Sequence, residues 1–464
     1  MAMHATGVRT VPSAEKEPAA VTALFSKIGW RILPFLIICY MIAFLDRINI
    51  GYAQLQMKQT LTFSDATYGF GAGIFFVGYF LFEVPSNLLL ERIGVRKTLL
   101  RIMFTWGIVA CAMAFVQTPL QFYVARFLLG ALEAGFFPGI ILYLTYWYPS
   151  ARRGQIIAMF MTATAIASVI AGPLSGATMK YFNDIEGWHG WQWLFISQGL
   201  PASILGLAAY FYLQDKPEDA KWLSTEEKTA LRFQLDHDHK DVESAHHAGF
   251  FQMLKDPKVY GLSFTYFLLL GATYTMVFWI PSLIKSWGVA DLLHVGLLAT
   301  LPQIAGIIGT ILMGRHSDKT RERRWHYATC VAVAAVGLLA ITFSHGNLVA
   351  SVIGLTLAGL GFISATPLFF TTITEYLSKA SAAGGIALIS SLGNLGPAVA
   401  PSLTGYISAT TGNSLYSTYL IVGAYLLSGL LLLIIVKAAD PNEVVDEPAV
   451  ETGTDLLRQP APRS

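Results

Sequence analysis

Four charged residues stand inside long apolar stretches of this sequence. Asp46 and Arg47 are adjacent in one stretch, and Arg126 and Glu133 share another. A charge at the centre of a bilayer costs from about 2.5 to well over about 10 kcal/mol, so such residues face a partner or a water-filled cavity and mark an ion or substrate path. Two cations and two anions in one half of the chain therefore predict a device that moves an organic anion together with protons.

The spacing of these residues indicates how they are presented. Arg126, Gly130 and Glu133 are spaced i, i+4 and i+7, so they share one helix face across two turns. Gly130 would leave an indentation there for a neighbouring helix or a ligand. Asp46 and Arg47 are adjacent and cannot point the same way. The alternative is that these residues are fixed ion pairs that join the first and fourth spans, but buried pairs add little stability compared with apolar residues.

The residue types suggest separate roles. Arginine stays charged and offers a planar fork that matches a carboxylate, so Arg47 and Arg126 are the candidate substrate-binding residues. Asp46 and Glu133 are the candidate proton-coupling residues, since burial and a neighbouring arginine shift the pKa of a carboxyl in opposite directions. When such an acid is protonated, its arginine is freed for the substrate. We expect no cofactor other than protons as the coupling ion.

The composition predicts a membrane protein. Of the 464 residues, 54% are hydrophobic and 13% are charged, whereas soluble proteins are about 25% charged. A spanning helix needs about 20 apolar residues, and twelve segments meet that length. The fold class expected is all-α and polytopic, with twelve transmembrane helices in two pseudo-symmetric six-helix halves. The predicted spans are 30–53, 68–90, 98–116, 120–148, 155–179, 191–213, 260–284, 294–313, 326–344, 347–376, 384–409 and 416–437.

Basic residues indicate the orientation. With both termini placed inside, 26 of the 31 Lys and Arg fall on the inner side. The other five are Lys58, Lys180 and Lys285 in outer loops and Arg47 and Arg126 within spans. The positive-inside rule thus predicts cytoplasmic termini. The dispersal of these charges among short loops predicts no nucleic-acid partner.

The longest polar interruption divides the spans six and six. The expected parts are a cytoplasmic N-terminal tail 1–27, a first half 28–213, a cytoplasmic central loop 214–259, a second half 260–437 and a disordered cytoplasmic tail 438–464. The first 27 residues lack the apolar core of a signal peptide. Ser224 and Glu227 form a capping-box pattern, which predicts a short surface helix in the central loop.

The histidines and cysteines favour no metal site. The central loop contains His237, His239, His246 and His247. Without Cys or regular helical pairing, a solvated linker is favoured over a metal site. The three cysteines lie far apart within spans, where packing is the expected role.

An internal repeat crosses the central division. The loop after the second span and the loop after the eighth share an acidic–basic pattern, and the fifth and eleventh spans share Gly-Pro steps. Such repeats build transporter folds, with the binding site at the repeat interface. The loop patterns are Asn87-x3-Glu91-Arg92-x-Gly94-x-Arg96-Lys97 and Gly314-x3-Asp318-Lys319-x-Arg321-x-Arg323-Arg324, and the Gly-Pro steps are Gly172-Pro173 and Gly396-Pro397.

Neutral groups must supply recognition in the second half, whose span interiors carry almost no charge. The candidates are Tyr266, Tyr274, Gln303, Phe369, Phe370, Thr371, Ser390, Ser391 and Asn394. Among them Gln303, Phe370 and Asn394 are the expected substrate contacts, with Tyr79 from the first half. Glu83, one turn beyond Tyr79, is expected to be a structural partner for helix ends.

Several motifs resemble those of one family. They are Phe44-Leu45-Asp46-Arg47-Ile48-Asn49, Glu83-Val84-Pro85-Ser86-Asn87, Arg126-Phe127-Leu128-Leu129-Gly130, Glu133-Ala134-Gly135-Phe136-Phe137-Pro138-Gly139, Gly190-Trp191-Gln192-Trp193-Leu194-Phe195 and the stretch 383–396. The chain resembles the major facilitator superfamily, and within it the anion:cation symporter family, whose members include bacterial tartrate, galactonate, glucarate and hydroxyphenylacetate permeases and, more distantly, sialin. The resemblance covers essentially all of 30–437.

The resemblance implies a proton-coupled importer of a small organic carboxylate. It assigns proton coupling to Asp46 and Glu133, carboxylate binding to Arg47 and coupling with Glu133 to Arg126. Phe44 lacks a hydroxyl, and Phe370 lies near a position that is Trp in many relatives. Both departures favour a less polar anion over a sugar acid as the substrate.

We expect a monomer in a bacterial inner membrane whose partners are the organic anion, protons and the lipid bilayer. An exporter or exchanger on the same fold is the first alternative. A sensor without a transport cycle is a second, although the chain has no sizeable soluble domain for signalling. The sequence has no nucleophile–base set, phosphate loop or HExxH motif, so an enzyme is not expected.

Overall fold

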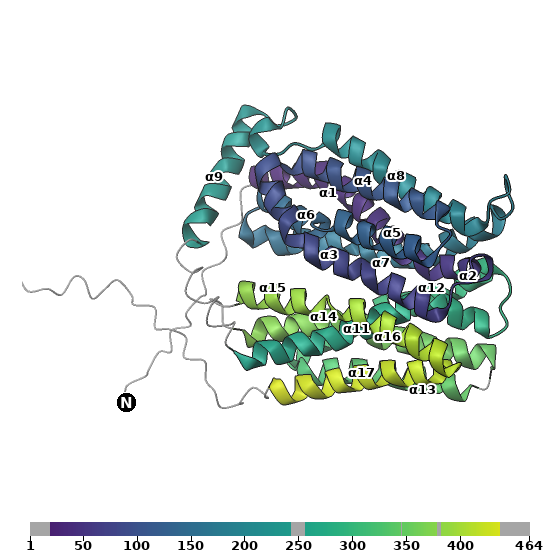
Figure 1. Ribbon diagram of the computed structural model, residues 1–464. Coiled ribbons are helices and arrows are strands. Elements are labelled where there is room, and N and C mark those ends of the chain that lie inside the picture. The colour runs from purple at the N-terminus through teal and green to yellow at the C-terminus, as the bar shows by residue number, and fades with distance from the viewer. Residues whose placement is uncertain (1–18, 243–255, 345, 378–381, 437–464) are drawn as a thin grey trace, which may run out of the picture.

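The computed structural model describes residues 19–242, 256–344, 346–377 and 382–436, without the side chains of 237–242 and 382–384. Within these ranges every regular element is a helix, and twelve helical segments are long and apolar enough to cross a membrane. The predicted all-α fold with twelve transmembrane helices is confirmed. Figure 1 shows the helices in two bundles that lie side by side.

The first bundle contains the first six spans. Its helices are α1 (Ala19–Ile48), α2 (Ile50–Thr60), α3 (Asp65–Ile93), α4 (Val95–Ala112), α5 (Pro119–Glu133), α6 (Phe136–Thr145), α7 (Ser150–Tyr181) and α8 (Gly190–Tyr212). A short 3-10 turn, η1 (Met113–Phe115), follows α4.

The second bundle contains the last six spans. Its helices are α11 (Pro257–Ser286), α12 (Leu292–Thr320), α13 (Arg324–Phe343), α14 (Leu348–Tyr376), α15 (Ala382–Gly393), α16 (Gly396–Thr411) and α17 (Ser414–Ile435). Between the bundles, η2 (Pro217–Asp219) and α9 (Thr225–Val242) project at one end of the molecule (Figure 1). We call this the α9 end and the opposite one the far end.

Three of the predicted spans are interrupted. The first breaks at Asn49 between α1 and α2, the fourth between α5 and α6, and the eleventh between α15 and α16. Gly135 begins α6 with φ of +86°, a left-handed conformation that a side chain would strain. Helix α1 begins at Ala19, well before the predicted residue 30. The apolar run measures the membrane thickness, whereas polar residues such as Lys27 continue the helix beyond it.

The predicted capping box begins α9. The Glu227 N–H donates to the Ser224 hydroxyl over 3.2 Å, and the Ser224 N–H donates to the Glu227 carboxylate over 2.8 Å. The helix extends to Val242. Lys27 of α1 forms an ion pair with Glu227 at 2.8 Å, which holds α9 against the first bundle.

The acidic–basic repeat has the same geometry in both halves. Gly94 and Arg321, which align in the two patterns, both adopt positive φ, at 84° and 53°. Two residues beyond Gly94, Arg96 donates from Nε to a carbonyl near the end of α8 at 2.7 Å. In the second half, Arg324 donates to a carbonyl at the end of α17 at 2.8 Å. Each loop therefore ties the third helix of its half to the sixth.

Glycines bring the two bundles together toward the far end. A Cβ at Gly172 of α7 would overlap the Gly296 backbone of α12, and one at Gly405 of α16 would overlap the Asp65 backbone of α3. Small residues allow membrane helices to approach this closely. Of the two Gly-Pro steps, Gly172 therefore lies in a contact between the halves, whereas Gly396 packs against the Phe267 backbone of α11 in its own half.

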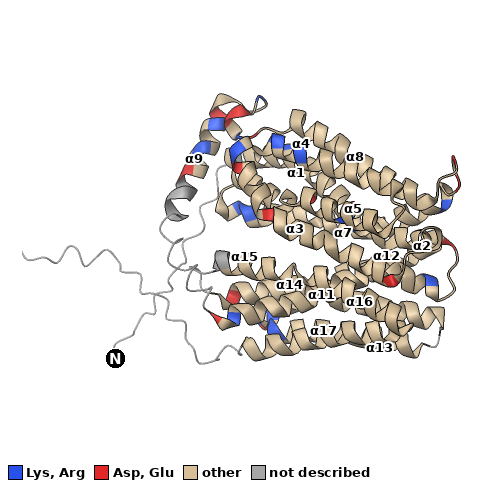
Figure 2. Ribbon diagram, in the orientation of Figure 1, with Lys and Arg blue, Asp and Glu red and all other residues tan. Residues whose placement is uncertain are grey.

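Polar side chains reinforce this far-end contact. Asp65 of α3 accepts hydrogen bonds from Lys58 at 2.5 Å and from Ser408 of α16 at 2.6 Å. Lys180 of α7 forms an ion pair with Asp291, which caps the start of α12. Figure 2 shows that the other charges gather mainly at the α9 end and that the bundle interiors are largely uncharged.

Candidate functional site

The end of α1 presents Asp46 and Arg47 in different directions, as their adjacency requires. The Asp46 carboxylate accepts a hydrogen bond from the Trp106 indole of α4 at 2.7 Å and another from the Asn49 amide at 3.0 Å. Asp46 is 5% exposed, and within the described residues no basic side chain lies within 4 Å of it. Its negative charge is therefore held by two neutral donors.

We call Asp46, Arg47, Arg126 and Glu133 together the charged group. The Arg47 guanidinium is its centre. It forms an ion pair with the carboxylate of Glu133, the last residue of α5. Its Nη1 lies 3.3 Å from the Tyr274 hydroxyl of α11, to which it donates. Arg47 thus connects the first and fourth spans and contacts the second bundle as well.

Arg126 is placed apart from Glu133, the partner that the resemblance implied. Its Nε donates to the Gly71 carbonyl of α3 at 3.2 Å, and its Nη2 is buried without a hydrogen-bond partner in the described structure. The side chain is 1% exposed. The ion pair of Glu133 is with Arg47 instead, because both residues lie next to helix breaks that turn them toward each other.

Close contact between α3 and α5 positions two aromatic rings beside these charges. A Cβ at Gly130 would overlap the backbone carbonyl of Phe75, as the predicted indentation requires, and Gly78 meets the α5 backbone in the same way. The Arg47 guanidinium carbon lies 5.3 Å from the ring centre of Tyr79 and 5.6 Å from that of Phe75. Guanidinium groups at this distance are stabilised by the ring electrons.

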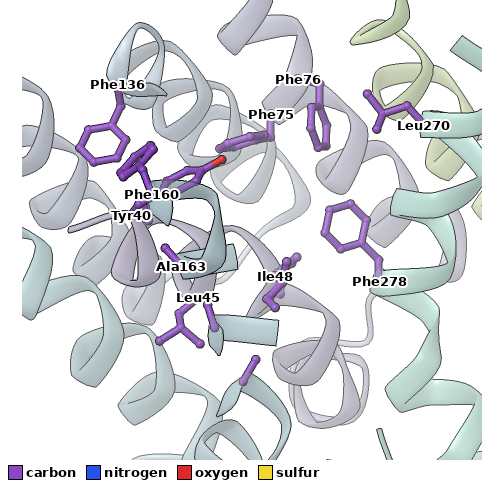
Figure 3. Packing of buried hydrophobic residues seen from close by; sticks show 14 of the residues in the cluster. Tyr40, Leu45, Ile48, Phe75, Phe76, Phe136, Phe160, Ala163, Leu270 and Phe278 are labelled. Atoms are coloured by element: carbon purple, nitrogen blue, oxygen red, sulfur yellow. The ribbon is translucent and has the colours of Figure 1, made fainter. Parts of the chain in front are cut away.

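The second bundle meets the charged group through aromatic rings. Phe76 packs edge-on against Tyr274 with ring centres 4.8 Å apart. Figure 3 shows Phe76 facing Phe278 of the second bundle, while Phe75 lies nearer Tyr40 of the first. The contact of Tyr274 with Arg47 makes it the second-bundle residue nearest the ion pair among the contacts observed.

The other predicted contacts of the second half lie outside this group. Phe370 packs edge-on against Tyr266 at 5.1 Å, Gln303 is half-buried on α12, and Asn394 lies at the break between α15 and α16. No observed contact joins these three residues to Arg47 or Glu133 in the described chain. Glu83 is half-buried and forms no ion pair within 4 Å there, so its predicted role at helix ends gains no support.

The remaining candidates make no hydrogen bond or ion pair with these charged residues in the described structure, or they lie outside it. Cys39, Cys111 and Cys330 are free thiols. His246, His247 and the C-terminal tail lie outside the described residues, as do the side chains of His237 and His239.

Sequence reasoning missed the partners of Asp46. Asn49 was three residues away in the quoted motif, the spacing of one helical turn. Trp106 lies in the middle of the third span, and a buried indole N–H there needs an acceptor. Phe75 was missed as well, since nothing in its local sequence indicates that two arginines would reach it.

Comparison with known families agrees with this architecture. The model of the Major Facilitator Superfamily matches residues 36–383, and a second match covers residues 284–462. The chain belongs to the major facilitator superfamily. It is a transporter rather than an enzyme, as the superfamily's fold and its relatives indicate.

Several transporters of the superfamily are similar over nearly their whole length. A proposed metabolite transport protein of Pseudomonas putida, NicT, is 44% identical over 89% of this chain and 94% of its own. A proposed tartrate transporter of Agrobacterium vitis is 44% identical over 91% and 96%. A quinolone resistance transporter of Acinetobacter baumannii is 40% identical over 89% and 94%.

Solved structures of the superfamily share the fold. A bacterial homologue of the human lysosomal transporter Spinster, in an inward-facing and unoccupied conformation, aligns with a TM-score of 0.71 at 17% identity, over 88% of this chain and 95% of that one. At 17% identity this similarity shows a shared fold.

Proposed function

We propose that this transporter is a proton-coupled symporter that imports a small organic carboxylate by alternating access. The observation that carries the proposal is the buried Arg47–Glu133 ion pair, which also contacts Tyr274 of the second bundle. A guanidinium already paired with a carboxylate is built to accept another carboxylate in its place. Its position between the bundles suits a repeat-interface site.

Exchange of carboxylates on Arg47 gives the coupling. When Glu133 takes up a proton it becomes neutral, and Arg47 is left as a buried cation without a counter-charge. An uncompensated buried charge costs about 3–5 kcal/mol, so a substrate carboxylate is favoured there. When substrate leaves toward the cytoplasm, Glu133 loses its proton and pairs with Arg47 again.

Asp46 and Arg126 are the second acid–base set in this proposal. Asp46 is buried without a cationic partner within 4 Å in the described structure, so it can take up a proton without breaking an ion pair. Arg126 has an unpartnered buried N–H and can help to balance the charge of the substrate. If protons outnumber substrate charges, the membrane potential adds about 2.3 kcal/mol per charge per 100 mV.

The contacts of the two bundles support an orientation. They meet through glycine backbones and ion pairs at the far end, while basic residues gather at the α9 end. The positive-inside rule places the α9 end in the cytoplasm of a bacterial cell, with the protein in its inner membrane. In this assignment the far end is the closed periplasmic side. We propose that one chain suffices for transport.

The substrate class follows from the ligand chemistry. A tartrate-like dicarboxylate, a sugar acid or an aromatic acid fits two arginines, and the name of the Agrobacterium relative favours the first. The rings of Phe75 and Tyr79 lie beside Arg47, and Tyr274, on which Phe76 packs, bonds it through its hydroxyl; these rings favour a planar acid. Gln303, Phe370 and Asn394 are proposed to contact the rest of the substrate after the bundles close.

Export is the second candidate function. The quinolone resistance relative is 40% identical, and its name concerns resistance rather than uptake. An exporter on this fold would use the same charged site with proton antiport. The two functions predict opposite proton movements.

The test is a liposome assay with purified protein and a trapped pH-sensitive dye. Tartrate, galactonate, glucarate, phthalate and hydroxyphenylacetate are added outside one at a time. We expect internal acidification with at least one acid and none in Asp46→Asn. Glu133→Gln should lose proton-driven accumulation while exchange of substrate continues. Alkalinisation on addition of a quinolone or an acid would favour export, and no response to any acid would contradict the symport proposal.

A further inference from the structure

One aromatic ring contacts both buried guanidinium groups. The ring centre of Phe75 lies 4.8 Å from the guanidinium carbon of Arg126 and 5.6 Å from that of Arg47. Within the described chain, no other ring makes a cation–π contact with two arginines. The two cations are carried by different helices, α1 and α5, and the ring by a third, α3.

The Phe75 ring is held firmly in this place. Its backbone carbonyl lies against Gly130, where a Cβ on α5 would overlap it. The ring is 1% exposed and packs edge-on against Phe76 at 5.1 Å. Figure 3 shows it beside Tyr40 of α1 in the interior of the first bundle. Because its backbone and its packing hold the Phe75 ring in place, the ring also restricts the position of a guanidinium group that stacks on it.

The same ring affects whether Glu133 forms its ion pair with Arg47 or with Arg126. Arg126 shares the helix face of Glu133 and is near enough to interact with it electrostatically, yet the ion pair forms with Arg47. The Arg126 guanidinium instead lies over Phe75 with its Nε on the Gly71 carbonyl. The ring thus stabilises a charged Arg126 without using a carboxylate.

We propose that Phe75 is a positioning residue for proton coupling: its ring holds Arg126 away from Glu133, so that Glu133 pairs with Arg47 alone. This inference rests on the proposed symport function. It means that protonation of Glu133 frees Arg47, the residue that meets the substrate. If Arg126 formed the ion pair with Glu133, Arg47 would be free whether or not Glu133 was protonated. Substrate could then be transported without protons.

The charged and titratable groups near this ring come from three elements of the first bundle and one of the second. They are Tyr40, Asp46 and Arg47 of α1, Tyr68, Tyr79 and Glu83 of α3, Arg126 and Glu133 of α5, and Tyr274 of α11. Leucine adds no titratable group, so a changed pH profile in Phe75→Leu would arise from redistribution of these groups around Glu133.

The experiment compares three variants with the wild type in liposomes. Phe75→Leu removes the ring and keeps an apolar side chain, and Phe75→Tyr restores a ring. Phe160→Leu is the matched control, because Phe160 is a fully buried ring in the same cluster that stacks on Tyr40 at 4.8 Å and contacts no guanidinium in the described structure. Each is assayed for tartrate accumulation driven by a pH gradient and for tartrate counterflow without one, with hydroxyphenylacetate as the probe if the wild type does not carry tartrate.

We expect Phe75→Leu to lower proton-driven accumulation by about tenfold, because it removes the cation–π contacts of the ring with both Arg126 and Arg47. Counterflow should stay within about twofold of the wild type, and the pH profile of accumulation should flatten. Phe75→Tyr should restore the ratio of the two activities, and Phe160→Leu should leave it unchanged.

An unchanged ratio of accumulation to counterflow in Phe75→Leu would overturn the inference. Both activities could then stay at the wild-type level, or both could fall by the same factor, as a purely structural role would give. A wild type that shows counterflow but no gradient-driven accumulation would instead contradict the proposed proton coupling, so the two failures are distinguishable.

Discussion

The two halves of the molecule pack alike but carry different chemistry. In the first half, Arg47 and Glu133 form an ion pair inside the spans, with Asp46 and Arg126 close by. In the second half, the group that reaches this pair is the neutral hydroxyl of Tyr274. In both halves an arginine of the inner loop nevertheless bonds the end of the sixth helix, although Arg96 and Arg324 stand one position apart in the aligned patterns, and glycines of both halves form the contact between them.

This contrast indicates that the two halves have different roles in transport. The repeated features are those that hold helices together, and they depend on backbone geometry that both halves share. The charges are not repeated, because one buried ion pair is enough to respond to a proton and each further buried charge is costly. We therefore expect substitutions in the first half to change coupling and substitutions in the second half to change affinity or closure.

The largest effect is expected for Arg47→Lys. Lysine keeps the charge but cannot bind Glu133 and Tyr274 through one planar fork. Loss of a charge-assisted bond costs about 1.5–3 kcal/mol, so kcat/KM for uptake should fall by about 100-fold. Arg31→Lys is the control, since Arg31 belongs to α1 like Arg47 but stacks on Tyr212 of α8, away from the site. Wild-type kinetics in Arg47→Lys would exclude it as the carboxylate ligand.

The matched glycine contacts allow a test of the symmetry. Gly172→Ala and Gly405→Ala would each place a Cβ against backbone of the opposite half. Overpacking of this kind costs about 1–3 kcal/mol, so both should favour opening at the far end to a similar degree. Reaction of a cysteine introduced near the far end with a membrane-impermeant reagent measures this. Gly423→Ala, where a Cβ has open space, should change nothing.

Unequal effects of the two alanine variants would show that one half forms the far-end contact more tightly than the other. No effect of either would mean that this contact does not limit the transport cycle.

A smaller effect is expected for Tyr274→Phe. It removes the hydroxyl that accepts from Arg47 at 3.3 Å and keeps the ring packed on Phe76. A hydrogen bond to a charged group contributes about 1.5–3 kcal/mol, and at 3.3 Å the lower value applies, so KM should rise by about tenfold with proton coupling intact. Tyr425→Phe is the control, because its hydroxyl lies at a similar distance, 3.4 Å, from Thr273 and away from the charged group. Uncoupled transport in Tyr274→Phe would contradict the division between the halves.

The smallest effect is expected at the far-end ion pair. The hydrogen bond from the Lys180 ammonium lowers the pKa of the Asp291 carboxyl below its usual range. A carboxyl with a lowered pKa contributes above its usual value of about 3.9 and loses that contribution only as the pH falls through the lowered one. The pair therefore stays charged between about pH 5 and 8.

Asp291→Asn should accordingly change transport by less than about threefold, and by the same factor at each pH in that window, because exposed ion pairs contribute little. Uptake measured across the window checks this. A changed pH profile in Asp291→Asn would place part of the proton response at the far end instead of in the first half.

Much of the architecture could be predicted from the sequence, because apolar runs of membrane length have few alternatives. The twelve spans, the inner loop repeat and the capping box of α9 all follow from local patterns. The charged residues of the proposed chemistry were also identifiable, since charge within a span is rare. The start of α1 was placed too late because a helix continues where its apolar character ends.

Pairing was decided only by the tertiary structure. The sequence places Arg126 and Glu133 on one helix face, yet the break after Glu133 and the end of α1 turn Glu133 toward Arg47. The contact of Gly130 with the Phe75 backbone then places one ring against two arginines from different helices. Residue types fix which groups are charged, whereas the close approach of three helices fixes which charges meet, since that depends on backbone positions that no local pattern records.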